Sequence, residues 1–158
     1  MRCSFFSWAV TKSVAGSPSG LTLTPVDVQW GSSPGDRFGS SVAGVGDVDG
    51  DGFADIAVGS PEASQGAGEA LVFLGSASGL GPEASGFVFG SGRLGASLAG
   101  AGDVDGDGLA DLLVGAPAFA GEGAAQLFSA EGFPGRGVAL RLARPSAPLP
   151  IGLLGAAS

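Results

Sequence analysis

Short apolar runs, each stopped by glycine or proline, recur along the middle of the chain. Two of them are Ile56-Ala57-Val58-Gly59-Ser60-Pro61 and Leu112-Leu113-Val114-Gly115-Ala116-Pro117. Runs of this length are short for a helix, and glycine and proline at their ends are typical of buried β-strands. The pattern therefore predicts a chain built of short strands.

The same pattern predicts four strands in each of two consecutive units. We expect strands near residues 41–43, 55–59, 67–74 and 86–89 in the first unit, and near 97–99, 111–115, 124–129 and 138–142 in the second. Residues 26–30 are predicted to form the last strand of a preceding unit. Four short strands per unit, separated by glycine-rich turns, are typical of β-propeller blades.

An acidic segment is repeated between the first two predicted strands of each unit. Asp47-Val48-Asp49-Gly50-Asp51-Gly52-Phe53-Ala54-Asp55 returns 56 positions later as Asp103-Val104-Asp105-Gly106-Asp107-Gly108-Leu109-Ala110-Asp111, changed only at the seventh place. The flanks repeat at the same spacing. A fixed period of this length indicates a repeat architecture, in which each unit buries its apolar face against a neighbour.

These two segments carry the net charge of the chain. They contain eight of its 15 acidic residues, and the other seven are balanced by the seven lysines and arginines, which leaves a charge of -8. Four carboxylates within one short loop repel each other unless a cation or protons neutralise them. A bound divalent ion would neutralise this charge.

The donor types predict which ion binds. Oxygen ligands without histidine or a nearby cysteine suit a hard cation, and the loop spacing favours calcium over magnesium, which needs a tighter octahedral geometry. We expect two Ca²⁺ sites, with these ligands: Asp47, Asp49, Asp51, Asp55 and the carbonyl of Phe53 in the first, and Asp103, Asp105, Asp107, Asp111 and the carbonyl of Leu109 in the second. An EF-hand is excluded, because its twelfth position would be Val58 or Val114, which cannot ligate a metal.

The order of these features resembles a known repeat. Phe38-Gly39, the acidic segment and Gly59-Ser60-Pro61 follow one another as in the FG-GAP repeats of the integrin α-subunit β-propeller and its bacterial relatives, and Leu94-Gly95 and Gly115-Ala116-Pro117 mark a second copy. The resemblance covers roughly residues 16–133. It implies an all-β fold, an incomplete β-propeller of about two four-stranded antiparallel blades with calcium loops. It also implies a seven-bladed closed ring in the family, ligand recognition on the face opposite the calcium loops, and no chemistry within a blade.

The expected organisation has five parts. Residues 1–15 are either a signal peptide or a truncated strand, 16–37 end a preceding blade, 38–93 and 94–134 are FG-GAP repeats, and the basic, proline-containing residues 135–158 form a divergent, disordered tail. Two repeats are too few to close a ring. The chain is therefore expected to be a fragment, to assemble with copies or another chain, or to fold poorly, and the fragment is favoured.

Several residues outside the loops also have expected positions. The phenylalanines of the first unit are expected to pack between blades, as aromatic residues dominate core burial. They are Phe38, Phe53, Phe73, Phe87 and Phe89. Arg37 and Arg93 precede the two landmarks at equivalent positions. Each either pairs with a neighbouring blade or stays on the surface.

The sequence predicts a calcium-binding, non-catalytic module for adhesion or recognition, with a protein or polysaccharide ligand. No catalytic residues are expected, because the chain has no histidine and its clustered acids follow a ligand pattern. The alternative is an accessory segment of a larger secreted enzyme such as a hydrolase. A pI near 4.1 argues against nucleic-acid binding, and no apolar segment approaches the ~20 residues that span a bilayer. Weak calcium loops favour an extracellular, periplasmic or cell-surface location.

Overall fold

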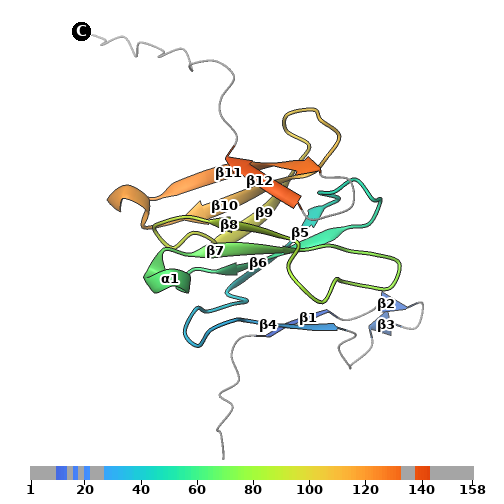
Figure 1. Ribbon diagram of the computed structural model, residues 1–158, viewed down its shortest axis with the longest axis horizontal. Helices are drawn as coiled ribbons and strands as arrows, with labels where there is room; N and C mark the ends of the chain where they lie inside the picture. Colours follow the sequence, from blue (N-terminus) through green and yellow to red (C-terminus); the bar gives the residue numbers. More distant parts are fainter. Residues whose placement is uncertain (1–9, 14–15, 18–19, 22–26, 133–137, 143–158) are drawn as a thin grey trace, which may run out of the picture.

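The computed structural model describes residues 10–13, 16–17, 20–21, 27–132 and 138–142. Two four-stranded antiparallel sheets dominate this part of the chain (Figure 1). The first sheet contains β5 (Ser41–Gly46), β6 (Asp55–Ser60), β7 (Glu69–Phe73) and β8 (Gly86–Phe89), and the second contains β9 (Ser97–Gly102), β10 (Asp111–Ala116), β11 (Ala124–Gly132) and β12 (Val138–Leu142). Each strand pairs with the next one along the chain, which confirms the predicted all-β fold of an incomplete propeller.

Two one-turn helical segments interrupt the all-β pattern. α1 (Ala63–Gly66) joins β6 to β7, and the 3-10 turn η1 (Phe119–Gly121) joins β10 to β11 at the equivalent place in the second blade. Within the described residues, no helix is long and apolar enough to cross a membrane.

A further pair of strands precedes the first blade. β1 (Val10–Ser13) pairs antiparallel with β4 (Asp27–Trp30), and between them β2 (Gly16–Ser17) pairs with β3 (Gly20–Leu21). The start of β4 lies 59 positions before the start of β8, and β1 precedes β7 by the same distance. β1 and β4 therefore correspond to the third and fourth strands of a preceding blade, and β4 lies where its last strand was expected. Residues 10–13 of the segment expected to be a signal peptide or a truncated strand therefore form a strand, and the rest of residues 1–15 lies outside the described residues.

The fourth strand of the second blade lies within the segment that was expected to be disordered. β12 pairs with β11 from Val138↔Gly132 to Leu142↔Phe128. The expectation of disorder from residue 135 onward is therefore wrong for residues 138–142. Their apolar residues alternate along the sequence, and the free edge of β11 offers backbone groups to pair with, which outweighs the basic composition. Residues 143–158 lie outside the described residues.

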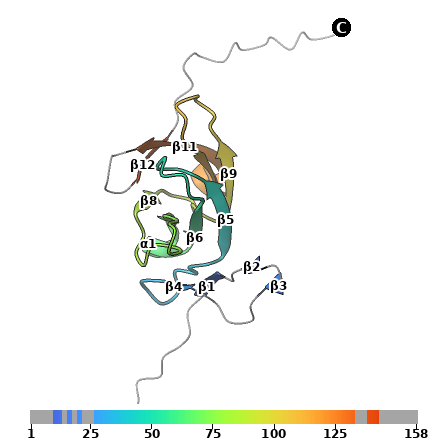
Figure 2. The same ribbon diagram turned by 90° about the vertical axis from the view of Figure 1, so that its right-hand side faces the viewer.

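The main core lies between the two sheets. Strands β5 to β8 place alternate residues against the second sheet, and Figure 2 shows β9 beside β5. The buried core residues are Val45, Val48, Ala57, Ala70, Val72 and Val88 from the first repeat and Leu94, Leu112, Val114, Ala116, Phe128 and Ala130 from the second. Each blade thus buries an apolar face that it cannot bury alone.

The phenylalanines divide into two groups. Phe38 and Phe73 are buried and meet edge to face, with ring centroids 6.2 Å apart. Phe53, Phe87 and Phe89 are 42%, 58% and 62% exposed, so the two described sheets do not bury them between blades. In β8 the strand alternation turns Val88 toward the core, which places both neighbouring phenylalanines on the other face.

The glycines of the repeat landmarks lie at a close approach of the two blades. The Gly39 N–H donates to the Gly59 carbonyl at 3.1 Å, and the Gly95 N–H donates to the Gly115 carbonyl at 3.1 Å. A Cβ added at Gly59 would overlap the carbonyl oxygen of Gly95. The landmark hydrogen bonds therefore connect the start of each blade to the end of its second strand. The close contact of Gly59 with Gly95 connects the first blade to the second.

An ion pair also lies at the junction between the two repeats. Arg93, just before the second landmark, reaches Glu62 of the first blade at 3.2 Å. The arginine side chain is 56% exposed, so the pair adds little to stability.

Candidate metal centres

The two acidic loops occupy equivalent hairpins. The first connects β5 to β6 and the second connects β9 to β10. Gly50 and Gly52 have φ angles of +80° and +90°, and Gly106 and Gly108 have φ angles of +82° and +93°. These left-handed positions are open to glycine at little cost and let each loop turn back on itself twice within a few residues.

The first aspartate of each loop orders the loop backbone. In the first loop, Asp47 accepts hydrogen bonds from the N–H groups of Gly50 at 2.7 Å, Asp51 at 3.1 Å and Gly52 at 2.8 Å. In the second loop, the corresponding distances from Asp103 to Gly106, Asp107 and Gly108 are 2.6, 3.1 and 2.9 Å. The sequence identity of the two loops is thus matched by one geometry.

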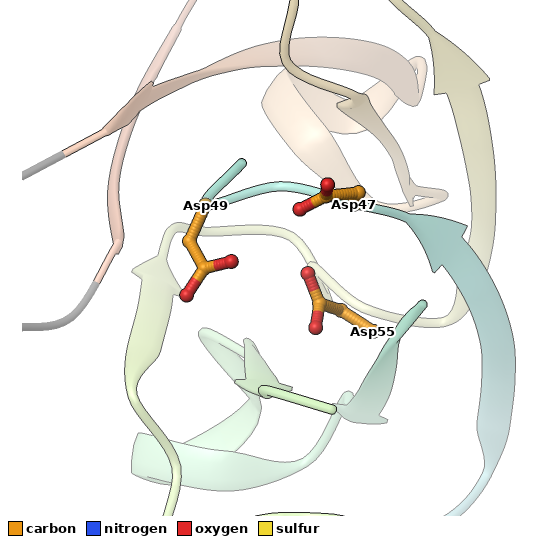
Figure 3. A group of neighbouring side chains, drawn as sticks. All are labelled: Asp47, Asp49 and Asp55. Carbon is orange, nitrogen blue, oxygen red and sulfur yellow. The ribbon is translucent and has the colours of Figure 1, made fainter. Parts of the chain in front are cut away.

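Three of the four predicted carboxylate ligands in each loop meet. Asp47, Asp49 and Asp55 each offer an oxygen, and these oxygens all lie within 4.8 Å of one another; their carboxylates converge on one point (Figure 3). Asp103, Asp105 and Asp111 form the equivalent group in the second loop.

The fourth predicted carboxylate lies outside each group. Asp51 accepts a hydrogen bond from the Phe53 N–H at 2.8 Å, and Asp107 accepts one from the Leu109 N–H at 2.8 Å. Both aspartates are exposed. Their role as ligands, and that of the carbonyls of Phe53 and Leu109, stays a prediction.

The last aspartate of each loop is buried, in contrast to the others. Asp55 is 1% exposed and accepts hydrogen bonds from Val48 at 2.8 Å and from Gly75 at 2.7 Å. Asp111 is fully buried and accepts from Val104 at 2.8 Å and from Ala130 at 3.2 Å. The distant partners, Gly75 and Ala130, carry no signal in the sequence, because a backbone N–H reveals its partner only in the folded chain.

The pKa values of the first group respond to burial and to mutual repulsion. Burial raises the pKa of Asp49 and Asp55 above the ordinary value, and the neighbouring carboxylates raise it further, against opposing backbone hydrogen bonds. Burial also raises the pKa of Asp47, but the N–H groups of Gly52, Gly50 and Asp51 outweigh it, so that the net pKa is lowered. Two of the three carboxylates therefore resist ionisation when no cation is bound.

The donor set of each group fits a hard divalent cation. All the converging atoms are carboxylate oxygens, which calcium and magnesium prefer. Within the part of the chain that the structure describes, the one ion pair joins Arg93 to Glu62, so no basic side chain there neutralises either loop. The carboxylates of each group could therefore hold a cation.

Comparison with known proteins identifies the repeats. The family model of the FG-GAP repeat matches residues 38–73 and 94–128. The chain contains two FG-GAP repeats. Each match begins at the phenylalanine or leucine of its landmark and includes one acidic loop.

The relatives with similar sequences are integrin alpha subunits. Integrin alpha-IIb from Mus musculus is 44% identical over 99 residues, which is 59% of this chain and 10% of the relative. Integrin alpha-PS5 from Drosophila melanogaster is 43% identical over 94 residues, or 54% of this chain and 9% of the relative. Integrin alpha-5 from Xenopus laevis is 41% identical over 106 residues, or 61% and 10%. The chain thus spans about a tenth of the length of these relatives.

Proposed function

We propose that this chain is a calcium-binding, non-catalytic FG-GAP module that serves adhesion or recognition. The observation that carries the proposal is the repeated convergence of three carboxylates in the hairpin between the first two strands of each blade. The FG-GAP match and the integrin relatives support the kind of module.

Each loop supplies its ligands in a fixed order. Asp47, Asp49 and Asp55 would hold the first ion, with Asp51 and the Phe53 carbonyl as further donors. In the second loop, the same roles fall to Asp103, Asp105 and Asp111, with Asp107 and the Leu109 carbonyl as the further donors. Calcium supplies a charge of +2 that balances the loop and accepts several oxygen ligands at once.

Calcium acts on this chain through folding. Without an ion, the ionised loop carboxylates repel one another. In the first loop, burial, followed by this repulsion, raises the pKa of Asp49 and Asp55. An ion that binds the folded hairpin and not the unfolded chain stabilises the fold by mass action. The hairpins in turn fix the first two strands of each blade against the neighbouring sheet.

Exposed apolar residues of β5 and β10 support a need for further blades. Val42 of β5 is 49% exposed and Leu113 of β10 is 39% exposed. They face away from the shared core, on the sides where a propeller places the next blade. We infer that additional blades, from a longer polypeptide or from other copies, cover these faces.

The proposed setting is extracellular, periplasmic or at the cell surface, with a protein or polysaccharide ligand. The integrin relatives support this setting. A catalytic role is not proposed, since the carboxylates of each group converge as like donors and none is held apart as a separate acid.

Thermal unfolding with different cations tests the function. The melting temperature should rise when millimolar calcium replaces a chelator, and should rise less with magnesium at the same concentration. The double variant Asp49→Asn/Asp105→Asn should lose this calcium response. A wild-type melting temperature that is the same in calcium and in chelator would overturn the proposal.

A further inference from the structure

The second acidic loop supports the first through a backbone hydrogen bond. The N–H of Ala110, near the end of the second loop, donates to the carbonyl of Asp47, at the start of the first, over 2.8 Å. Asp47 is also the residue that orders the first loop through three hydrogen bonds. The contact therefore reaches the residue on which the geometry of the first metal group depends.

Side chains extend this contact on both sides of Asp47. A Cβ at Gly46 would lie 2.8 Å from the Cβ of Ala110, and a Cβ at Gly50 would lie 3.2 Å from Cδ2 of Leu109. Leu109 also packs against the core between the sheets. The first loop thus rests on a surface made by two residues of the second loop.

The support runs in one direction among the described residues. Gly102 and Gly106 are the equivalents of Gly46 and Gly50, with φ angles of +71° and +82°, and a Cβ at either would meet nothing within 4 Å. The second loop is therefore free on the side where the first loop is supported.

We propose that Leu109 and Ala110 are positioning residues for the first metal site, so that calcium in the second loop raises the calcium affinity of the first. Binding in the second loop fixes the backbone of Leu109 and Ala110, and a fixed neighbour lowers the ordering cost of the first loop. The coupling is reciprocal, as any equilibrium linkage between two sites must be. The inference rests on the proposed calcium function.

Calorimetry on a cycle of four proteins measures the coupling. Asp105→Asn disrupts the second site and retains the first, and Asp49→Asn disrupts the first site and retains the second. Wild type and the double variant complete the cycle. The product of the two affinities in wild type should exceed the product of the single-site affinities by about fivefold or more. Products that agree within error overturn the inference and leave the calcium function standing.

Variants at Leu109 locate the coupling. Leu109→Ala retains all eight loop carboxylates and the backbone carbonyl at residue 109. It should nevertheless bring the ratio of the wild-type-like affinity product to the single-site product close to one. Leu109→Met keeps the contact with Gly50 and should preserve the fivefold or larger ratio. A coupling that survives Leu109→Ala overturns the assignment of these positioning residues.

Hydrogen exchange gives a readout that needs no metal. In chelator, the Ala110 amide of wild type should exchange slowly, because the N–H donates a hydrogen bond to the backbone carbonyl of Asp47. Gly46→Ala should speed this exchange at least severalfold, whereas the matched Gly102→Ala should not. An unprotected Ala110 amide in folded wild type overturns the inference, whether or not calorimetry detects calcium binding. A protected amide in a chain that takes up no calcium overturns both the proposed function and the coupling.

Discussion

The carboxylate of Asp55 accepts a hydrogen bond from the backbone N–H of Gly75 at 2.7 Å. This bond connects the end of the first acidic loop to the turn that follows β7. Asp111 makes the corresponding connection to Ala130 in the second blade. The last aspartate of each loop is thus part of the blade structure as well as a proposed metal ligand.

Asp55→Ala should destabilise the protein even in chelator. The change leaves the N–H groups of Val48 and Gly75 without their acceptor, and each buried unpaired group costs about 1–3 kcal/mol. We expect a loss of about 2–4 kcal/mol in the free energy of unfolding, measured by urea denaturation. Asp49→Ala is the control, because Asp49 accepts only one long hydrogen bond, from the Asp51 N–H. Its free energy of unfolding should stay within ~0.5 kcal/mol of the wild-type value. Equal losses for the two variants would contradict the structural role of Asp55.

Asp51→Ala tests whether the fourth carboxylate is a ligand. If Asp51 binds the ion, its loss should weaken the first site by about tenfold or more and the second site much less, since affinity follows the number of charged ligands. Calorimetry resolves the two sites. An unchanged calcium affinity would show that Asp51 serves only as the acceptor for the Phe53 N–H. Asp107→Ala provides the matched test in the second loop.

Gly59→Ala should be far more damaging than the equivalent Gly115→Ala. A Cβ at Gly59 would overlap the backbone carbonyl of Gly95 in the next blade, which cannot move without separating the sheets. A Cβ at Gly115 would meet the Ser97 side chain, which can rotate away. We expect Gly59→Ala to cost about 3 kcal/mol or more and Gly115→Ala about 1 kcal/mol, measured by thermal unfolding. A reversed order would contradict the close contact of the blades.

Glu69→Gln should change how stability depends on pH. Burial, followed by the negative charge of Asp36, raises the pKa of Glu69 above its ordinary value of 4.5. The stability linked to protonated Glu69 is fully present below pH 4.5 and is lost as the pH rises through the raised value. In chelator, the variant should therefore melt at a higher temperature than wild type at pH 7, and the difference should shrink at pH 4.

Glu83→Gln provides the control for that experiment. Glu83 is exposed, and its substitution should change the melting temperature little. A Glu69→Gln variant that behaves like this control would contradict the burial of the Glu69 carboxylate.

The sequence predicted the parts of the fold that depend on local pattern. Glycine and proline bound β6 and β10, and the repeat spacing predicted strands at the positions of β4, β8 and β12. The meeting of Asp47, Asp49 and Asp55 also follows from spacing within one short loop. Local turn geometry decides these features, so the residues alone specify them.

Features that depend on the approach of distant segments were not predictable. The contacts of Asp47 with Ala110 and of Gly50 with Leu109 join loops from different repeats. The exposure of Phe87 and Phe89 depends on which face of β8 another sheet covers. No periodicity in the sequence encodes either arrangement.

The stoichiometry of calcium binding tests the central claim most directly. Isothermal titration of metal-free wild type should give two ions per chain, and Asp49→Asn and Asp105→Asn should each give one. Retained melting transitions in all three proteins establish that the variants are folded. A folded wild-type chain that takes up no calcium, or a double variant that still binds two ions, would contradict the account.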